Sequence, residues 1–168
     1  FAAAGRAVHS VAKVSRVSHT AAPVISAARI ENSIAGGVCF AEGTDIATPS
    51  GSKDIEDVEK GDTVLAFDFA TGLTTSREVL ETYRGTTTLW VEIKFDNGTV
   101  KATPEHPFWV ESSQLWIEAA RLEPGMEILN AEGARVAVLA VDFRELAKPE
   151  TTYNFNVAEN HNYFAGAG

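Results

Sequence analysis

The pattern of hydrophobic and polar positions changes near residue 39. Beyond it, β-branched and aromatic residues recur in short runs, which is typical of β-strands. Such runs are DTVLAFD, REVLETYR, LWVEIKFD, TVKATPEHPFWV, MEILNAE and RVAVLAVDFREL, while TDIATPSGSKDI has the pattern of strand, turn and strand. Asn97-Gly98 lies between two of these runs and predicts a two-residue hairpin turn. Turn signals every ~8–12 residues predict an all-β body of many short strands.

An internal repeat crosses this body. The stretches IEDVEKG and EAARLEPG each predict a single helical turn, and both end in a glycine that precedes a strand. At an offset of 64, Val58, Gly61, Val64 and Leu65 recur as Leu122, Gly125, Ile128 and Leu129. Further on, VLETYR (79–84) resembles VLAVDFR (138–144). A duplicated β unit with pseudo-two-fold symmetry explains these matches, and chance similarity between β segments is the alternative.

The first 38 residues have a different pattern, rich in Ala, Val and Ser. Valines stand at every third position, with basic residues between them: Val8, Val11, Val14 and Val17 alternate with Arg6, Lys13 and Arg16. This spacing predicts a short amphipathic helix, interrupted at Pro23. We interpret residues 1–38 as a flanking segment or linker, with a membrane-surface helix as the alternative.

Composition and charge limit the classes of function that the chain can have. The 168 residues suit one domain, and 45% hydrophobic with 22% charged residues are ordinary globular values. The net charge of −9 divides into +3 for residues 1–38 and −12 for residues 39–168. An acidic body argues against nucleic-acid binding. No apolar run reaches the ~18 residues of a membrane span. No cysteine or histidine pairs have metal-ligand spacing, so we expect no metal, no cofactor and a monomer.

Cys39 is the only cysteine, and it stands where the two compositions meet. Gly36-Gly37-Val38 precedes it, and strand-like residues follow. A lone thiol in this position is a buried filler, half of an intermolecular disulfide, a metal ligand or a nucleophile. The residue alone does not decide between these.

A nucleophilic cysteine needs an acid or base and a group that polarises the carbonyl. His106 stands between two prolines in ATPEHPFWV, with Thr103 three residues before it. Such a segment is unsuited to a regular strand or helix, but it holds a ring in a fixed direction. His161 lies in a polar loop, ENHNYFAG, and Asn154 lies between two aromatic residues. For each of the histidines the alternative is a surface turn residue, and for Asn154 an outward-facing strand residue.

Together these motifs resemble the Hint (hedgehog/intein) superfamily. CFxxGTxI, IExVxxGDxV, TPEHPF and YNFNVxxxHNYF follow one another from Cys39 to about Phe164. TPEHPF and YNFNV are most similar to the pretoxin Hint and bacterial intein-like branches. The resemblance implies a Hint domain at residues 39–168, folded as a horseshoe-like β disk of two pseudo-symmetric units. It would account for the repeat.

The resemblance also implies roles. Cys39 would attack the carbonyl of Val38, so that the peptide bond becomes a thioester. His106 corresponds to the histidine that protonates the Cys39 amide nitrogen. Thr103 corresponds to the residue that orients the scissile peptide.

Two further residues correspond to the late motif. His161 would assist a C-terminal step, and Asn154 stands where many inteins have Asp, which limits it to hydrogen bonding. The chain stops at FAGAG before a His-Asn pair. We therefore expect cleavage at Val38–Cys39 without splicing.

The expected function is self-processing of a larger bacterial polypeptide, secreted or surface-exported, with the flanking segments as cis substrate and a toxin domain as a C-terminal partner. Two alternatives remain open: a cysteine hydrolase that acts in trans through Cys39 and His106, and an inactive β interaction module with the same fold.

Overall fold

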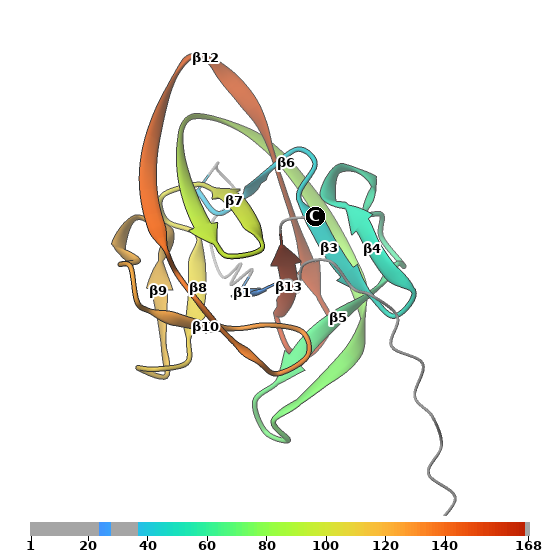
Figure 1. Cartoon of the computed structure of the whole chain (residues 1–168). Coiled ribbons are helices and arrows are strands. Elements are labelled where there is room, and N and C mark those ends of the chain that lie inside the picture. Colours follow the sequence, from blue (N-terminus) through green and yellow to red (C-terminus); the bar gives the residue numbers. More distant parts are fainter. Residues whose placement is uncertain (1–23, 28–36, 167–168) are drawn as a thin grey trace, which may run out of the picture.

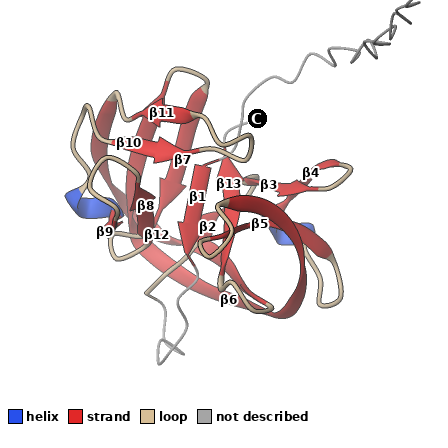
Figure 2. Cartoon of the chain, turned by 90° about the horizontal axis from the view of Figure 1, so that it is seen from below, coloured by secondary structure: helices blue, strands red, loops and turns tan. Residues whose placement is uncertain are grey.

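The computed structural model describes residues 24–27 and 37–166, which form strands and two short 3-10 helices (Figures 1 and 2). The first strands are β1 (Val24–Ala27), β2 (Phe40–Ala41), β3 (Asp45–Thr48), β4 (Gly51–Asp54), β5 (Thr63–Asp68), β6 (Leu73–Phe95) and β7 (Gly98–Ala102). The remaining strands are β8 (Pro107–Val110), β9 (Leu115–Glu118), β10 (Glu127–Leu129), β11 (Arg135–Ala137), β12 (Ala140–Val157) and β13 (Asn162–Gly166). The helices are η1 (Ile55–Asp57) and η2 (Ala119–Arg121). The expected all-β class is confirmed.

The described strands form two sheets. One has the order β11-β10-β8-β1-β13-β3-β4, with β9 paired to β8. The other has the order β12-β2-β7-β6-β5, and β12 also pairs with β6. The two-residue strand β2 therefore lies between β12 and β7, which places the residue before it, Cys39, beside both.

The long strands β6 and β12 run antiparallel along the molecule as curved ribbons (Figure 1). The sequence pattern predicts REVLETYR and LWVEIKFD as separate runs, whereas β6 continues through both. Between the two runs, residues 86–88 are all threonine, which favours extended backbone. The predicted hairpin also forms, but its turn residues are Asp96 and Asn97, and Gly98 already pairs with Phe95.

The internal repeat is confirmed by equivalent hydrogen bonds. Gly61 N donates to Val79 O at 2.8 Å, and Gly125 N donates to Val138 O at 2.8 Å. Both glycines have φ of 92°, a left-handed conformation that side chains disfavour. The 3-10 turns before them repeat as well, since Val58 N bonds to Ile55 O and Leu122 N to Ala119 O. Each half of the domain thus has the same turn, glycine and strand.

Four residues of the N-terminal flanking segment form β1, which pairs along its length with β13 and at Ser26 with Phe108 of β8. The helix expected from the valine spacing lies before Pro23, outside the described residues. The division of the chain at residue 39 stays a prediction.

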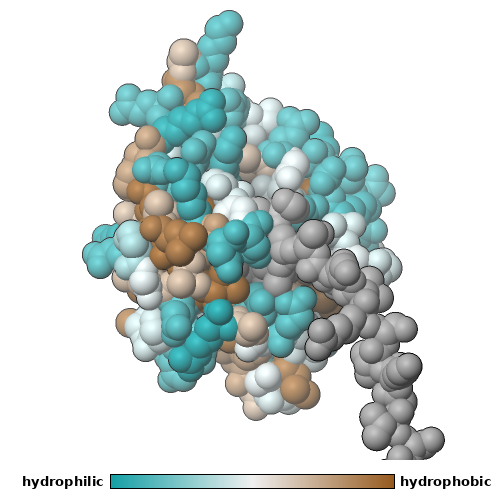
Figure 3. Space-filling view, in the orientation of Figure 1, coloured by the Kyte–Doolittle hydropathy of each residue, from teal (hydrophilic) through white to brown (hydrophobic). Residues whose placement is uncertain are grey.

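The core lies between the sheets. Its largest fully buried side chains include Trp90, Tyr163, Phe40, Phe108 and Phe155. On the face in Figure 3, hydrophilic side chains cover much of the surface and hydrophobic ones gather on the left of the view. Among the described residues, none of the helices is long and apolar enough to cross a membrane.

Candidate active site

Cys39 is 7% exposed and lies immediately before β2, in contact with the turn that follows β7. Its backbone N–H donates to Thr103 Oγ1 at 2.9 Å, and its carbonyl oxygen accepts from Thr103 N at 2.9 Å. Thr103 is 1% exposed. The structure therefore brings these two predicted residues together, although 64 positions separate them.

The Thr103 hydroxyl also bonds the backbone on the other side of Val38. Its Oγ1 is 3.0 Å from Gly37 O and 3.3 Å from Cys39 O. A hydroxyl has only one proton to donate, and the shorter distance favours the hydrogen bond to Gly37 O. Thr103 therefore accepts from the Cys39 amide and donates to the Gly37 carbonyl. These two bonds fix the direction of the backbone around the Val38–Cys39 peptide.

Asn154 holds the carbonyl of the same peptide. Its Nδ2 donates to Val38 O at 2.5 Å. Its Oδ1 accepts from Phe155 N at 2.7 Å and from the Tyr163 hydroxyl at 2.8 Å. Because two donors face Oδ1, the amide must turn its nitrogen toward Val38. Asn154 is only 4% exposed, so it is not the outward-facing strand residue of the alternative interpretation.

The His106 ring is fully buried against aromatic neighbours, with ring centroids 4.0 Å from Phe40 and 5.4 Å from Phe108. Within the described residues neither ring nitrogen has a hydrogen-bond partner. Burial lowers the pKa of His106 from 6.5 to about 3, so the ring is neutral near pH 7. The backbone N–H of His106 donates to Thr103 O, which ties the histidine to the site. The ring packs on the residue after Cys39, and it is not a surface turn residue.

The thiol is also perturbed. Burial raises the pKa of Cys39, while the Thr152 hydroxyl and the Val38 backbone act in the opposite direction and lower it. In this state Thr152 Oγ1 has no hydrogen-bond partner among the described residues. The resting group is therefore a protonated thiol, which would have to lose its proton before it could act as a nucleophile.

His161 lies apart from this group. It is exposed, has a φ of 50° just before β13, and its Nδ1 is 3.2 Å from Asn156 Oδ1. No contact among the described residues joins it to Cys39. Its role in a C-terminal step stays a prediction.

Two further residues, Thr152 and Tyr163, were not singled out by the sequence reasoning. Thr152 precedes Asn154 by two positions in TTYNFN, so strand alternation puts both side chains on one face. That alternation was the available signal for Thr152. For Tyr163, only the three-dimensional contact with Asn154 distinguishes it from other core aromatics.

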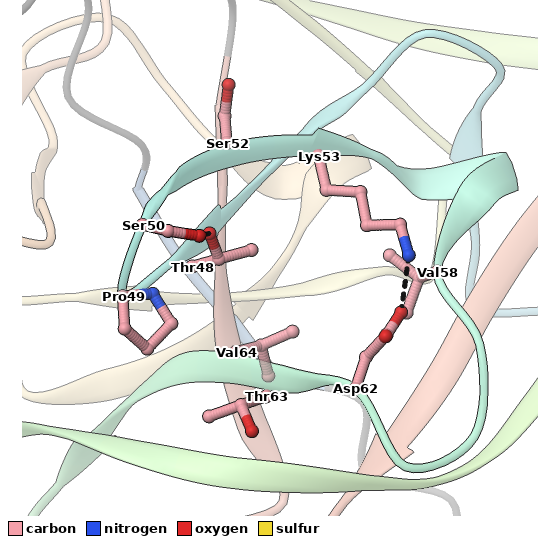
Figure 4. A pocket seen from close by; sticks show the side chains of 9 residues that line it. All are labelled: Thr48, Pro49, Ser50, Ser52, Lys53, Val58, Asp62, Thr63 and Val64. Atoms are coloured by element: carbon pink, nitrogen blue, oxygen red, sulfur yellow. Dashed lines mark hydrogen bonds and ion pairs between the residues drawn. The ribbon is translucent and has the colours of Figure 1, made fainter.

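The structure also has a hollow of about 550 Å³ at the β3–β4 hairpin and the start of β5 (Figure 4). An ion pair between Lys53 and Asp62, 2.7 Å long, crosses it. None of its lining residues belongs to the Cys39 site. Among the described residues, no group of three or more His, Cys, Asp or Glu side chains could hold a metal ion.

Comparison with known proteins identifies the fold. The sequence model of the Pretoxin HINT domain matches residues 45–168. The chain belongs to the pretoxin Hint family. The match begins beyond Cys39, so the family assignment rests on the body of the domain and not on the predicted nucleophile. The resemblance to the Hint superfamily is confirmed.

Solved structures agree with this assignment. The bacterial intein-like domain from Clostridium thermocellum is 32% identical, with a TM-score of 0.74, and the match covers 78% of this chain and 94% of that one. The DnaB intein from Synechocystis sp. PCC 6803 shares the fold at 20% identity and a TM-score of 0.66, covering 76% and 92% of the two chains. No curated protein sequence matches the chain. The Hint fold of the domain, with its pseudo-symmetric halves, is therefore established.

Proposed function

We propose that this Hint domain cleaves its own chain at Val38–Cys39 through an N–S acyl shift. The observation that carries the proposal is that side chains hold both ends of this one peptide group. Asn154 donates to its carbonyl oxygen and Thr103 accepts from its N–H. A peptide that served only as a linker would not need two buried polar side chains, which are costly to place in a core.

The reaction begins with attack of Cys39 Sγ on the carbonyl carbon of Val38, through a five-membered ring. Negative charge then develops on Val38 O, which already faces Asn154 Nδ2. A donor aimed at such an oxygen typically contributes about 10²–10³ in rate. The S–C bond forms, the C–N bond breaks, and the proton of the thiol ends on the Cys39 nitrogen as an amine. Water or an added thiol then cleaves the thioester.

His106 is the proposed carrier of that proton. Its ring is neutral and neither nitrogen has a hydrogen-bond partner among the described residues, so a ring nitrogen is available to carry the thiol proton to the nitrogen of Cys39. A buried polar group without a partner lowers stability, and such groups persist most often where the reaction uses them. The unpartnered ring therefore supports a role in which His106 gains its partner during the reaction.

The burial of Cys39 opposes the alternative of a hydrolase that acts in trans. Cys39 is almost inaccessible, and the carbonyl of the adjoining Val38 already accepts a hydrogen bond from Asn154. An external peptide would have to displace this bonded segment.

Mass spectrometry of the purified chain with and without dithiothreitol or hydroxylamine tests the proposal. Wild type should release fragments 1–38 and 39–168, and Cys39→Ala should stay whole. A folded wild-type chain that stays whole contradicts self-cleavage and supports the inactive module. Mixing wild type with a tagged Cys39→Ala chain tests action in trans, because only a trans hydrolase would cut the tagged chain.

The family name supports a biological context. Because the matched family is that of pretoxin Hint domains, we propose that the chain is part of a larger polypeptide that also carries a toxin domain. Expression of the whole parent protein, followed by mass mapping of its fragments, would show whether a cut at Val38–Cys39 separates such a domain from its neighbours. Fragments that all retain this junction would contradict the proposal.

A further inference from the structure

Thr152 is a fully buried threonine whose hydroxyl has no hydrogen-bond partner among the described residues. It lies on β12, two positions before Asn154, so the two side chains leave the strand on the same face. Asn154 reaches the Val38 carbonyl from this face. A polar atom buried without a partner, beside reacting groups, calls for an explanation.

The register of β2 and β12 brings Thr152 to the thiol. Thr152 pairs with Ala41, and Tyr153 pairs with Phe40. Continued by one residue, the same register puts Cys39 opposite Asn154 and makes Cys39 a diagonal neighbour of Thr152. Diagonal neighbours of an antiparallel pair lie on the same face, so the Cys39 thiol and the Thr152 hydroxyl face the same side of the sheet. In agreement, the Thr152 hydroxyl lowers the pKa of Cys39, against the larger effect of burial.

We propose that Thr152 is a positioning residue for the Cys39 sulfur, to which its hydroxyl donates a hydrogen bond as the thiol becomes a thiolate. This inference rests on the proposed acyl shift. A hydroxyl is both donor and acceptor, so the Thr152 hydroxyl, which has no partner among the described residues, can rotate to donate its O–H to the thiolate as that charge forms. It exchanges no proton with the surroundings, and the thiol proton leaves to the base.

The geometry divides the roles on β12 between two neighbours. Thr152 holds the sulfur and Asn154 holds the oxygen of the carbonyl that the sulfur attacks. Among the described residues no charged side chain contributes to the perturbation of the thiol pKa, and Thr152 is the side chain of this part of the chain that acts on it.

Thr152→Val tests this role because it keeps the shape and removes only the hydroxyl. Loss of a hydrogen bond to a charged sulfur should slow thiol-induced cleavage by about 10- to 100-fold. Thr152→Ser keeps the hydroxyl and should stay within about threefold of wild type. Thr151→Val, the same change at the exposed neighbouring position, is the matched control and should leave the rate unchanged.

Two readouts separate this role from a structural one. Urea unfolding should show Thr152→Val as stable as wild type or more so, because an unsatisfied hydroxyl is replaced by a methyl group. The difference in ultraviolet absorbance between each protein and its Cys39→Ala counterpart isolates the thiolate of Cys39, the single cysteine, from the three tyrosines, and its titration should move to higher pH in Thr152→Val. A slower reaction in a more stable protein is not the signature of lost packing.

The outcomes distinguish this proposal from the proposed function. If wild type cleaves and Thr152→Val cleaves at the same rate, Thr152 has no positioning role and self-cleavage stands. If wild type does not cleave, self-cleavage fails, and the thiolate titration alone decides the contact. If the thiolate titration of Thr152→Val is the same as that of wild type, the proposed contact between Thr152 and the Cys39 sulfur is wrong.

Discussion

The burial of His106 predicts a pH dependence of stability that a single substitution removes. The pKa of the ring falls from 6.5 to about 3 on folding, so the folded chain binds fewer protons than the unfolded chain between these values. Stability must therefore decrease as the pH falls below 6.5. Between pH 7.5 and pH 5.0 the loss is about 2 kcal/mol, since each pH unit below the unfolded pKa contributes about 1.4 kcal/mol.

The perturbation is His106→Leu, which fills much of the same space between Phe40 and Phe108 and cannot titrate. Urea unfolding at several pH values between 5.0 and 7.5 gives the free energy of unfolding of both proteins, in a Cys39→Ala background that prevents cleavage. Most carboxylates remain ionised above pH 5, and they contribute equally to both chains. The difference between the two stabilities should shift by about 2 kcal/mol in favour of the leucine variant at pH 5.0.

A difference that stays constant to within about 0.5 kcal/mol over this range would refute the reasoning. It would mean that the ring titrates alike in both states, because water or a hydrogen-bond partner reaches it. The same experiment bears on the mechanism. A ring that is neutral near pH 7 can act first as a base toward the thiol, whereas an imidazolium could act only as an acid.

Three further substitutions test the cleavage site, each by the rate of dithiothreitol-induced cleavage with circular dichroism as the check on folding. Asn154→Ala removes the donor to Val38 O and should slow cleavage by about 10²–10³-fold. Tyr163→Phe removes one of the two donors to Asn154 Oδ1 and leaves the Phe155 N–H in place, and a loss of up to about tenfold should follow because the amide is held less firmly in its orientation. Thr103→Val removes the acceptor of the Cys39 N–H and the donor to Gly37 O, and should slow cleavage by about tenfold or more. A wild-type rate in any of them would remove that residue from the mechanism.

Much of the fold could be predicted from the sequence because short local patterns mark its strands and turns. Gly61 and Gly125 mark the start of a strand in each half, and the repeat between them predicted the duplicated architecture that the matching hydrogen bonds confirm. The division of strands was less accurate. REVLETYR and LWVEIKFD belong to one strand because the threonines between them extend the backbone, a property that alternation of apolar residues does not reveal.

The candidate site could be predicted only in part from the sequence. Cys39, Thr103 and Asn154 were predicted from motif order, and in the structure the side chains of Thr103 and Asn154 form hydrogen bonds with the Val38–Cys39 peptide group. His106 was assigned a proton-transfer role, yet its sequence context of two prolines gave no sign of full burial, which arises from packing on Phe40. Thr152 was missed because its contact depends on the register between β2 and β12, strands that are more than a hundred positions apart.

The long strand β12 explains how a buried site can keep the geometry that this chemistry needs. Its pairing with β6 is irregular at two places, between Glu145 and Glu150 and between Asn156 and Val157. Between them, from Glu150 to Asn156, the register is unbroken, and β2 covers the other edge at Thr152 and Tyr153. A slip of one residue in this stretch would turn Thr152 and Asn154 to the opposite face. Pairing on both edges opposes such a slip, so the side chains that hold the carbonyl and lie beside the thiol are fixed by backbone hydrogen bonds.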